Sequence, residues 1–163
     1  MLCYVSVAPA LVAIVLACAA CASIPVEQRT TEGPLAEEIW IYRIGQMNGR
    51  EPTFEERRRW EGQLDLAISR YLVKDQEFAN SPQLTTFRFI RQASVGMSKE
   101  QVTILLGLPD RVATESVEVE RLASKYWVTI KDGSVSEAWV YPLGWRLYFS
   151  ESRLVDITQY LPR

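Results

Sequence analysis

Three short apolar segments near the C-terminus, separated by very short connections, constrain the fold more than any other feature of the chain. The segments are Glu137–Tyr141, Trp145–Phe149 and Leu154–Gln159, and they are joined by residues 142–144 and 150–153. Residues such as Val, Trp, Tyr and Phe favour strands. Connections this short join only neighbouring antiparallel strands. The sequence therefore predicts a three-stranded antiparallel β-meander.

Both faces of this predicted sheet are apolar. From the alternation of side chains along strands, we expect one face to hold Leu147, Phe149, Val155 and Ile157, and the other to hold Trp139, Tyr141, Arg146 and Tyr148. An antiparallel sheet usually has one polar face, so two apolar faces need two covers. We favour the extra N-terminal helices as the second cover. The alternative is that the second set is a candidate partner surface, because Trp, Tyr and Arg are common at interface hot spots.

Helix signals dominate residues 35–106, so the expected fold class is α+β. Residues 35–46 are predicted to form a short helix. A longer helix is expected to begin at Thr53, because Thr53 and Glu56 form a capping box, and to run to about residue 79. The remaining predicted elements are helices at 84–93 and 117–126 and a short strand at 110–114.

The segment Met97–Gly107 is expected to be a short amphipathic helix, because both of its ends are marked. Ser98 and Gln101 make a second capping box. Gly107 supplies a C-terminal stop, and the proline two positions later forbids continuation. The apolar residues between them form one stripe. We interpret this segment as a packing element rather than a binding site.

The first 26 residues contain no Asp, Glu, Lys or Arg. The apolar run Leu11–Ala17 is followed by small residues, a pattern typical of an export signal. Residues Ile14–Cys18 resemble a bacterial lipobox, in which the cysteine is lipidated and becomes the mature N-terminus. Cys18 is the expected lipidation site, and Cys21 is the alternative. The other interpretations are a plain secretory signal and an uncleaved transmembrane anchor, since Leu2–Ala22 is long enough to span a bilayer.

Composition excludes several classes of function. The chain has no histidine, and its three cysteines, Cys3, Cys18 and Cys21, all lie in the first 21 residues. The usual general base and the commonest metal ligand are thus missing. We therefore expect no catalytic, cofactor-binding or metal-binding residue, and the sequence indicates no small-molecule substrate. A formal net charge of −2 gives no electrostatic basis for nucleic-acid binding.

Residues Gly96–Val102 and Leu105–Asp110 resemble the signature helix of the BamE family, also called SmpA/OmlA. That family has a G-M-[ST]-x-x-x-V…LLG-x-P helix, followed by an aromatic W-x-Y strand and two further short strands. The corresponding strands here are Trp139–Tyr141, Leu147–Phe149 and Leu154–Val155. The resemblance covers about residues 94–158. It implies a helical pair on a three-stranded antiparallel sheet. Residues 35–93 have no counterpart in the family, and the helix at 117–126 is an insertion.

The resemblance and the lipobox together imply a function. We expect a non-enzymatic lipoprotein of the outer membrane that faces the periplasm, is held by its N-terminal lipid and assists outer-membrane assembly proteins or envelope integrity. The alternative is a periplasmic binding or inhibitor module on the same fold, anchored by lipid or by an uncleaved helix and unrelated to barrel assembly. The expected divisions are a signal peptide at 1–17, a lipidated tether at 18–34, a helical extension at 35–93 and a BamE-like α+β domain at 94–163.

Overall fold

A computed structural model describes residues 26–161. The signal peptide expected at 1–17 and the two candidate lipidation sites, Cys18 and Cys21, lie outside the described residues. The elements are β1 (Val26–Thr30), β2 (Glu32–Leu35), α1 (Ala36–Asn48), α2 (Phe54–Lys74), a 3-10 turn (Phe78–Asn80), a π-helical turn (Thr86–Ile90), β3 (Gln92–Ser94), α3 (Lys99–Leu106), β4 (Arg111–Ala113), α4 (Ser116–Ala123), a 3-10 turn (Ser124–Tyr126), α5 (Trp127–Ile130), a 3-10 turn (Lys131–Gly133), β5 (Glu137–Val140), β6 (Trp145–Ser150) and β7 (Arg153–Leu161).

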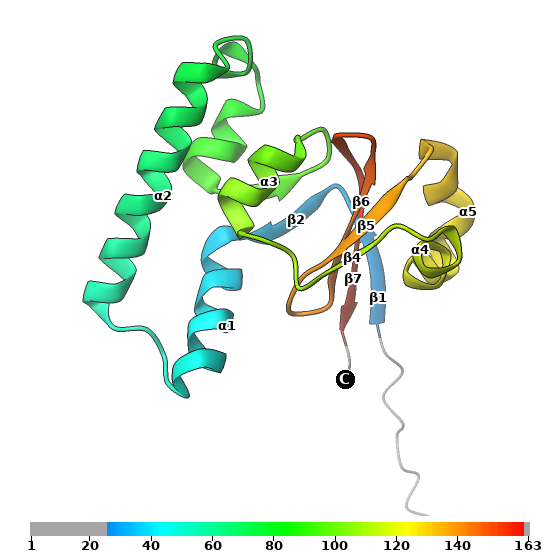
Figure 1. The fold of residues 1–163 in the computed structure, drawn as a ribbon, viewed down its shortest axis with the longest axis horizontal. Coiled ribbons are helices and arrows are strands. Elements are labelled where there is room, and N and C mark those ends of the chain that lie inside the picture. The colour runs from blue at the N-terminus through cyan, green and yellow to red at the C-terminus, as the bar shows by residue number, and fades with distance from the viewer. Residues whose placement is uncertain (1–25, 162–163) are drawn as a thin grey trace, which may run out of the picture.

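The fold is α+β, as predicted, and is built on an antiparallel sheet of five strands in the order β1-β7-β6-β5-β4. The predicted meander forms its centre, as β5, β6 and β7. The short strand predicted at 110–114 is present as β4 and pairs with β5. Strand β1 closes the other edge by pairing with β7, and β2 and β3 form a separate two-stranded ladder (Figure 1).

Strands β1 and β2 correct the expected tether at 18–34, which is wrong from Val26 onward. The sequence of β1 has no apolar alternation, so it reads as a polar linker. Its charged side chains are instead used in the fold: Glu27 accepts a hydrogen bond from Arg146, and Arg29 pairs with Asp156. Pairing with β7 satisfies the backbone hydrogen bonds of β1. Hydrophobicity patterns in the sequence do not reveal such pairing.

Both predicted capping boxes are present. The hydroxyls of Thr53 and Ser98 accept from the backbone N–H three residues on, and the side chains of Glu56 and Gln101 accept in return. Helix α1 continues to Asn48, two residues beyond the predicted end. The helix predicted at 84–93 stops at Ile90, because β3 follows it.

One face of the sheet shares a hydrophobic core with α1, α2 and α3, and within it α2 packs against α3. The core on this side includes Ile39 of α1, Ile68 of α2 and Val102 of α3, together with sheet residues such as Leu147. It therefore extends across the expected boundary at residue 94. The opposite face is covered by α4 and α5, through a smaller cluster formed by Ala113, Val119, Leu122, Ala123, Ile130, Ala138 and Tyr148.

The predicted assignment of side chains to the two faces is wrong. Residues directly opposite one another in an antiparallel ladder share a face, and Trp139 lies opposite Leu147. The register follows from the tight β5–β6 connection, in which the Tyr141 N–H donates to the Trp145 carbonyl. A bulge next to Phe149 also brings Leu154, rather than Val155, opposite it.

Two covers are present, as the apolar faces required, but their identities differ from the prediction. The N-terminal helices and α3 lie on the face that carries Trp139 and Leu147, and α4 and α5 cover the other. Figure 1 shows α4 and α5 on the opposite side of the sheet from α1–α3. The family-like helix is a packing element, as interpreted, because its Val102, Leu105 and Leu106 are buried.

Candidate partner-binding site

The partner surface predicted from Trp139, Tyr141, Arg146 and Tyr148 is wrong. Exposed fractions are 8% for Trp139, 2% for Tyr141 and 0% for Tyr148, and 18% for the Arg146 side chain. The first two lie in the larger core, whereas Tyr148 lies in the smaller one. The register divides the four residues between the two faces, and helices cover both faces.

These residues hold the fold together instead. The Tyr141 hydroxyl donates to the Gly107 carbonyl at 2.8 Å and so caps the end of α3. Arg146 donates to the Glu27 carboxylate at 3.0 Å and to the Leu122 carbonyl, which ties β1 and α4 to β6. Burial raises the pKa of Tyr148 to about 12, and its hydroxyl lies 3.1 Å from that of Thr158.

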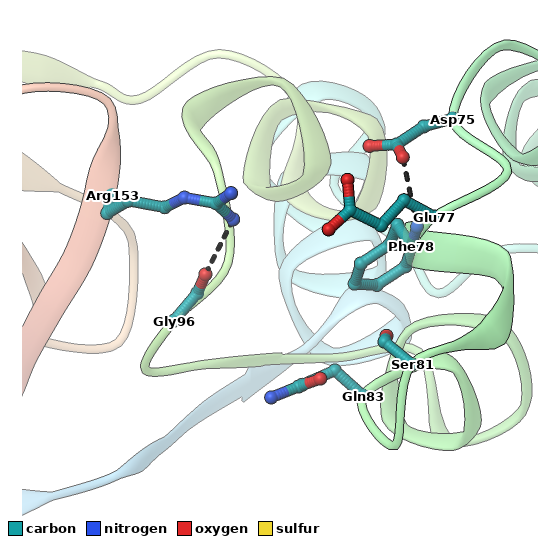
Figure 2. Close-up of a pocket in the computed structure, with 7 residues that line it drawn as sticks. All are labelled: Asp75, Glu77, Phe78, Ser81, Gln83, Gly96 and Arg153. Atoms are coloured by element: carbon teal, nitrogen blue, oxygen red, sulfur yellow. Dashed lines mark hydrogen bonds between the residues drawn. The ribbon is translucent and has the colours of Figure 1, made fainter.

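A polar pocket lies at the end of the sheet that carries the β6–β7 turn. It has a volume of about 230 Å³. Its lining residues, shown in Figure 2, come from the segment after α2, the loop before α3 and the start of β7: Asp75, Glu77, Phe78, Ser81, Gln83, Gly96 and Arg153.

Asp75 fixes the segment that forms one wall of the pocket. It ends α2, and its carboxylate accepts the Phe78 N–H at 2.9 Å and the Tyr71 hydroxyl at 2.8 Å. These hydrogen bonds, the Phe78 N–H foremost, lower the pKa of Asp75. Below this wall, the rings of Tyr71, Phe78 and Phe87 pack edge to face, with centroids 5.5–5.8 Å apart. The wall is therefore rigidly supported.

The loop before α3 forms the opposite wall. Gly96 has a φ of 95°, a conformation that glycine adopts without strain. Its N–H donates to the Leu154 carbonyl at 2.7 Å, and its carbonyl accepts from Arg153 at 3.1 Å. The first residue of the BamE-like motif thus joins the β6–β7 turn to α3 and places the Arg153 guanidinium at the pocket.

Charges of opposite sign face one another across the opening. Figure 2 shows the Glu77 carboxylate and the Arg153 guanidinium pointing toward each other. Among residues 26–161, no ion pair joins these two side chains. The Ser81 hydroxyl is buried and makes no hydrogen bond within the described chain. The pocket can therefore accept a polar group that both donates and accepts hydrogen bonds, such as a segment of a partner's backbone.

Sequence reasoning did not find this pocket. The helix predicted to run to about residue 79 ends at Lys74, five residues earlier. No local pattern indicates that the segment after it meets the β6–β7 turn. The one available signal was Gly96 in the family-like motif.

Two further findings bear on chemistry and anchoring. Within residues 26–161, no group of three His, Cys, Asp or Glu side chains is placed to hold a metal ion. No helix in that range combines the length and the apolar character needed to cross a bilayer. The alternative of an uncleaved transmembrane anchor concerns residues 2–22, which lie outside the described residues.

No family model, curated protein or solved structure matches this chain. The similarity to the BamE family therefore stays a resemblance, carried by the helix motif and the strands after it.

Proposed function

We propose that this chain is a non-enzymatic lipoprotein of the outer membrane that faces the periplasm and binds protein partners, in support of outer-membrane protein assembly or envelope integrity. One observation carries the proposal. Strand β1, the first described element, begins at Val26, only eight positions after Cys18 of the lipobox-like segment. A chain of eight residues spans at most about 29 Å, so a lipid on Cys18 would hold the domain directly at a membrane surface.

The arrangement of the family-like segment supports the same proposal. Helix α3 packs on the meander formed by β5–β7, and the W-x-Y strand contacts the end of α3 through Tyr141. This packing is compatible with the helical pair on a three-stranded sheet that the BamE resemblance implies, and it supports the proposal in that respect. The polar pocket beside Gly96 supplies a place where a partner segment can bind, at the edge of this unit.

The anchoring is tested by the mass of the mature N-terminus, measured in membrane fractions of the exporting bacterium. The wild type should yield a triacylated Cys18 peptide, Cys18→Ala should abolish it, and Cys21→Ala should leave it intact. A lipid on Cys21 would move the site but keep the proposal. A retained Met1, or a cleaved but unacylated N-terminus, would contradict it.

Partner binding is tested by co-purification with outer-membrane assembly proteins from solubilised envelopes. Glu77→Lys reverses a charge at the pocket, and we expect it to reduce recovery of the assembly proteins. Glu120→Lys makes the same change on an exposed site of α4 and should leave recovery unchanged. Recovery of no assembly component with the lipidated wild type would favour the alternative, a periplasmic binding or inhibitor module.

A further inference from the structure

Exposed apolar side chains gather at the end of the molecule where β1 begins. We define the tether-end rim as Tyr42 and Met47 of α1, Leu108 of the α3–β4 loop and Leu143 of the β5–β6 loop. Their exposed fractions are 38%, 78%, 74% and 41%. Isolated exposed apolar residues are common on protein surfaces, so the argument rests on where these four lie.

Contacts between the elements place the rim at one end of the sheet. Tyr42 and Met47 line a shallow depression of about 380 Å³ together with Pro142, which precedes Leu143. Arg43 donates to the Leu108 carbonyl at 2.7 Å, which holds the α3–β4 loop against α1.

The start of β1 lies at the same end of the sheet. The β5–β6 loop meets the end of β7, because the Tyr160 N–H donates to the Gly144 carbonyl at 2.9 Å. Val26, the first residue of β1, lies opposite Leu161 at this end of the ladder. Figure 1 shows the end of α1, the β5–β6 loop and the start of β1 toward the same end of the molecule.

The charges of the rim suit a lipid surface. Of the residues that line the depression, only Asp110 carries a carboxylate, and it is paired with Arg43 at 3.1 Å. An apolar surface with Tyr and a paired rather than a free carboxylate is compatible with the headgroup region of a bilayer, where amphipathic aromatic side chains are favoured.

We propose that the tether-end rim rests on the bilayer that holds the N-terminal lipid. The inference rests on the proposed function, because the lipid at Cys18 and a tether of at most about 29 Å bring this end to the membrane. The β6–β7 turn lies at the other end of the sheet. The pocket beside Gly96 and Arg153 therefore faces away from the bilayer, toward the periplasm.

Fluorescent labelling tests the contact. The chain has no cysteine after Cys21, so in full-length lipidated protein whose unlipidated cysteine is replaced by Ser, an introduced cysteine is the only thiol. In the Met47→Cys variant, the introduced thiol is labelled with the polarity-sensitive fluorophore NBD. Val73→Cys is the matched control, because Val73 is 77% exposed, nearly the same as Met47, and lies at the far end of α2. The lipidated proteins are reconstituted in vesicles of phosphatidylethanolamine and phosphatidylglycerol.

We expect the Met47 probe to shift to shorter wavelength and to be quenched by spin-labelled lipid, while the Val73 probe is unaffected. The N-terminal mass is measured on the same samples, so an unlipidated protein identifies failure of the proposed function. Equal, weak quenching at both positions in lipidated protein would overturn the inference about the rim. A Met47 shift that occurs only when outer-membrane proteins are added would also overturn it, since the rim would then bind protein.

Discussion

The ion pair between Arg29 and Asp156 fastens the first strand to the last, and its removal gives the sharpest stability prediction. Asp156 is buried, with 5% of the residue exposed to solvent. It accepts from Arg29 Nε at 2.9 Å and Nη2 at 2.8 Å, and from the Ile157 N–H at 2.9 Å. Asp156→Asn keeps the shape of the side chain and an oxygen for Ile157, but removes the charge that the guanidinium needs.

The size of the effect follows from burial on the two sides. Removing one partner of a fully buried pair costs about 3–5 kcal/mol, and a hydrogen bond to a charged group contributes about 1.5–3 kcal/mol. The Arg29 side chain is 44% exposed, so water can solvate it once its partner is gone, and the lower range applies. We expect Asp156→Asn to lower the free energy of unfolding by about 1.5–3 kcal/mol.

The assay is urea unfolding of the lipid-free protein, monitored by circular dichroism. The slope of the free energy of unfolding against urea concentration should be the same in the variant and the wild type. A double-mutant cycle with Arg29→Met should give a coupling energy of about 1–2 kcal/mol, because the two side chains are in direct contact. Arg121→Met, on a side chain that is 72% exposed, is the control and should change stability by less than about 0.5 kcal/mol. A change that small for Asp156→Asn, or additive effects in the cycle, would refute the reasoning.

Three further perturbations have defined outcomes. Hydrogen bonds from Arg50 and the Thr53 N–H lower the pKa of Glu56 to about 2 from its ordinary 4.5. Its stabilising contribution is therefore complete above pH 4.5 and is lost as the pH falls toward 2, and urea unfolding across this range should show a weaker acid dependence in Glu56→Gln. Gly144→Ala would place a Cβ against the Tyr160 carbonyl oxygen at a residue whose φ is 78°, so thermal unfolding should show a free energy of unfolding lower by at least about 3 kcal/mol. Gly62→Ala is the control: Gly62 lies inside α2, no atom lies within 4 Å of the added Cβ, and the change should raise the free energy of unfolding by about 0.5–1 kcal/mol. Burial raises the pKa of Tyr148 to about 12, so the stabilising contribution of its neutral hydroxyl is complete below pH 10 and declines as the pH rises toward 12. In Tyr148→Phe, the rise in absorbance at 295 nm that reports tyrosine ionisation should be smaller near pH 12 than in the wild type.

Local rules predicted the parts of the fold that local interactions determine. Ser98, Gln101 and Gly107 mark the ends of α3 because caps act within a few residues. The meander could be predicted because short connections leave few alternatives.

The parts that were mispredicted depend on distant contacts. The register of β5 against β6 decides which side Trp139 faces, and a shift of one residue reverses that assignment. Strand β1 is polar in sequence and becomes a strand only through its pairing with β7. The candidate pocket needs the segment after α2 to meet Arg153, which is a purely tertiary event. The sequence therefore indicates the elements better than the surfaces that they form.

The pairing of β1 with β7 also sets the order in which the protein can fold. Gln28 and Gln159, which are hydrogen-bonded partners across this ladder, lie 131 positions apart in the chain. Closing so long a loop is entropically costly, and folds dominated by such contacts form slowly. The β1 edge of the sheet can form only after residues 153–161 are available for pairing. The strand that comes first in the described chain is thus among the last to be paired, and β7 times the completion of the five-stranded sheet.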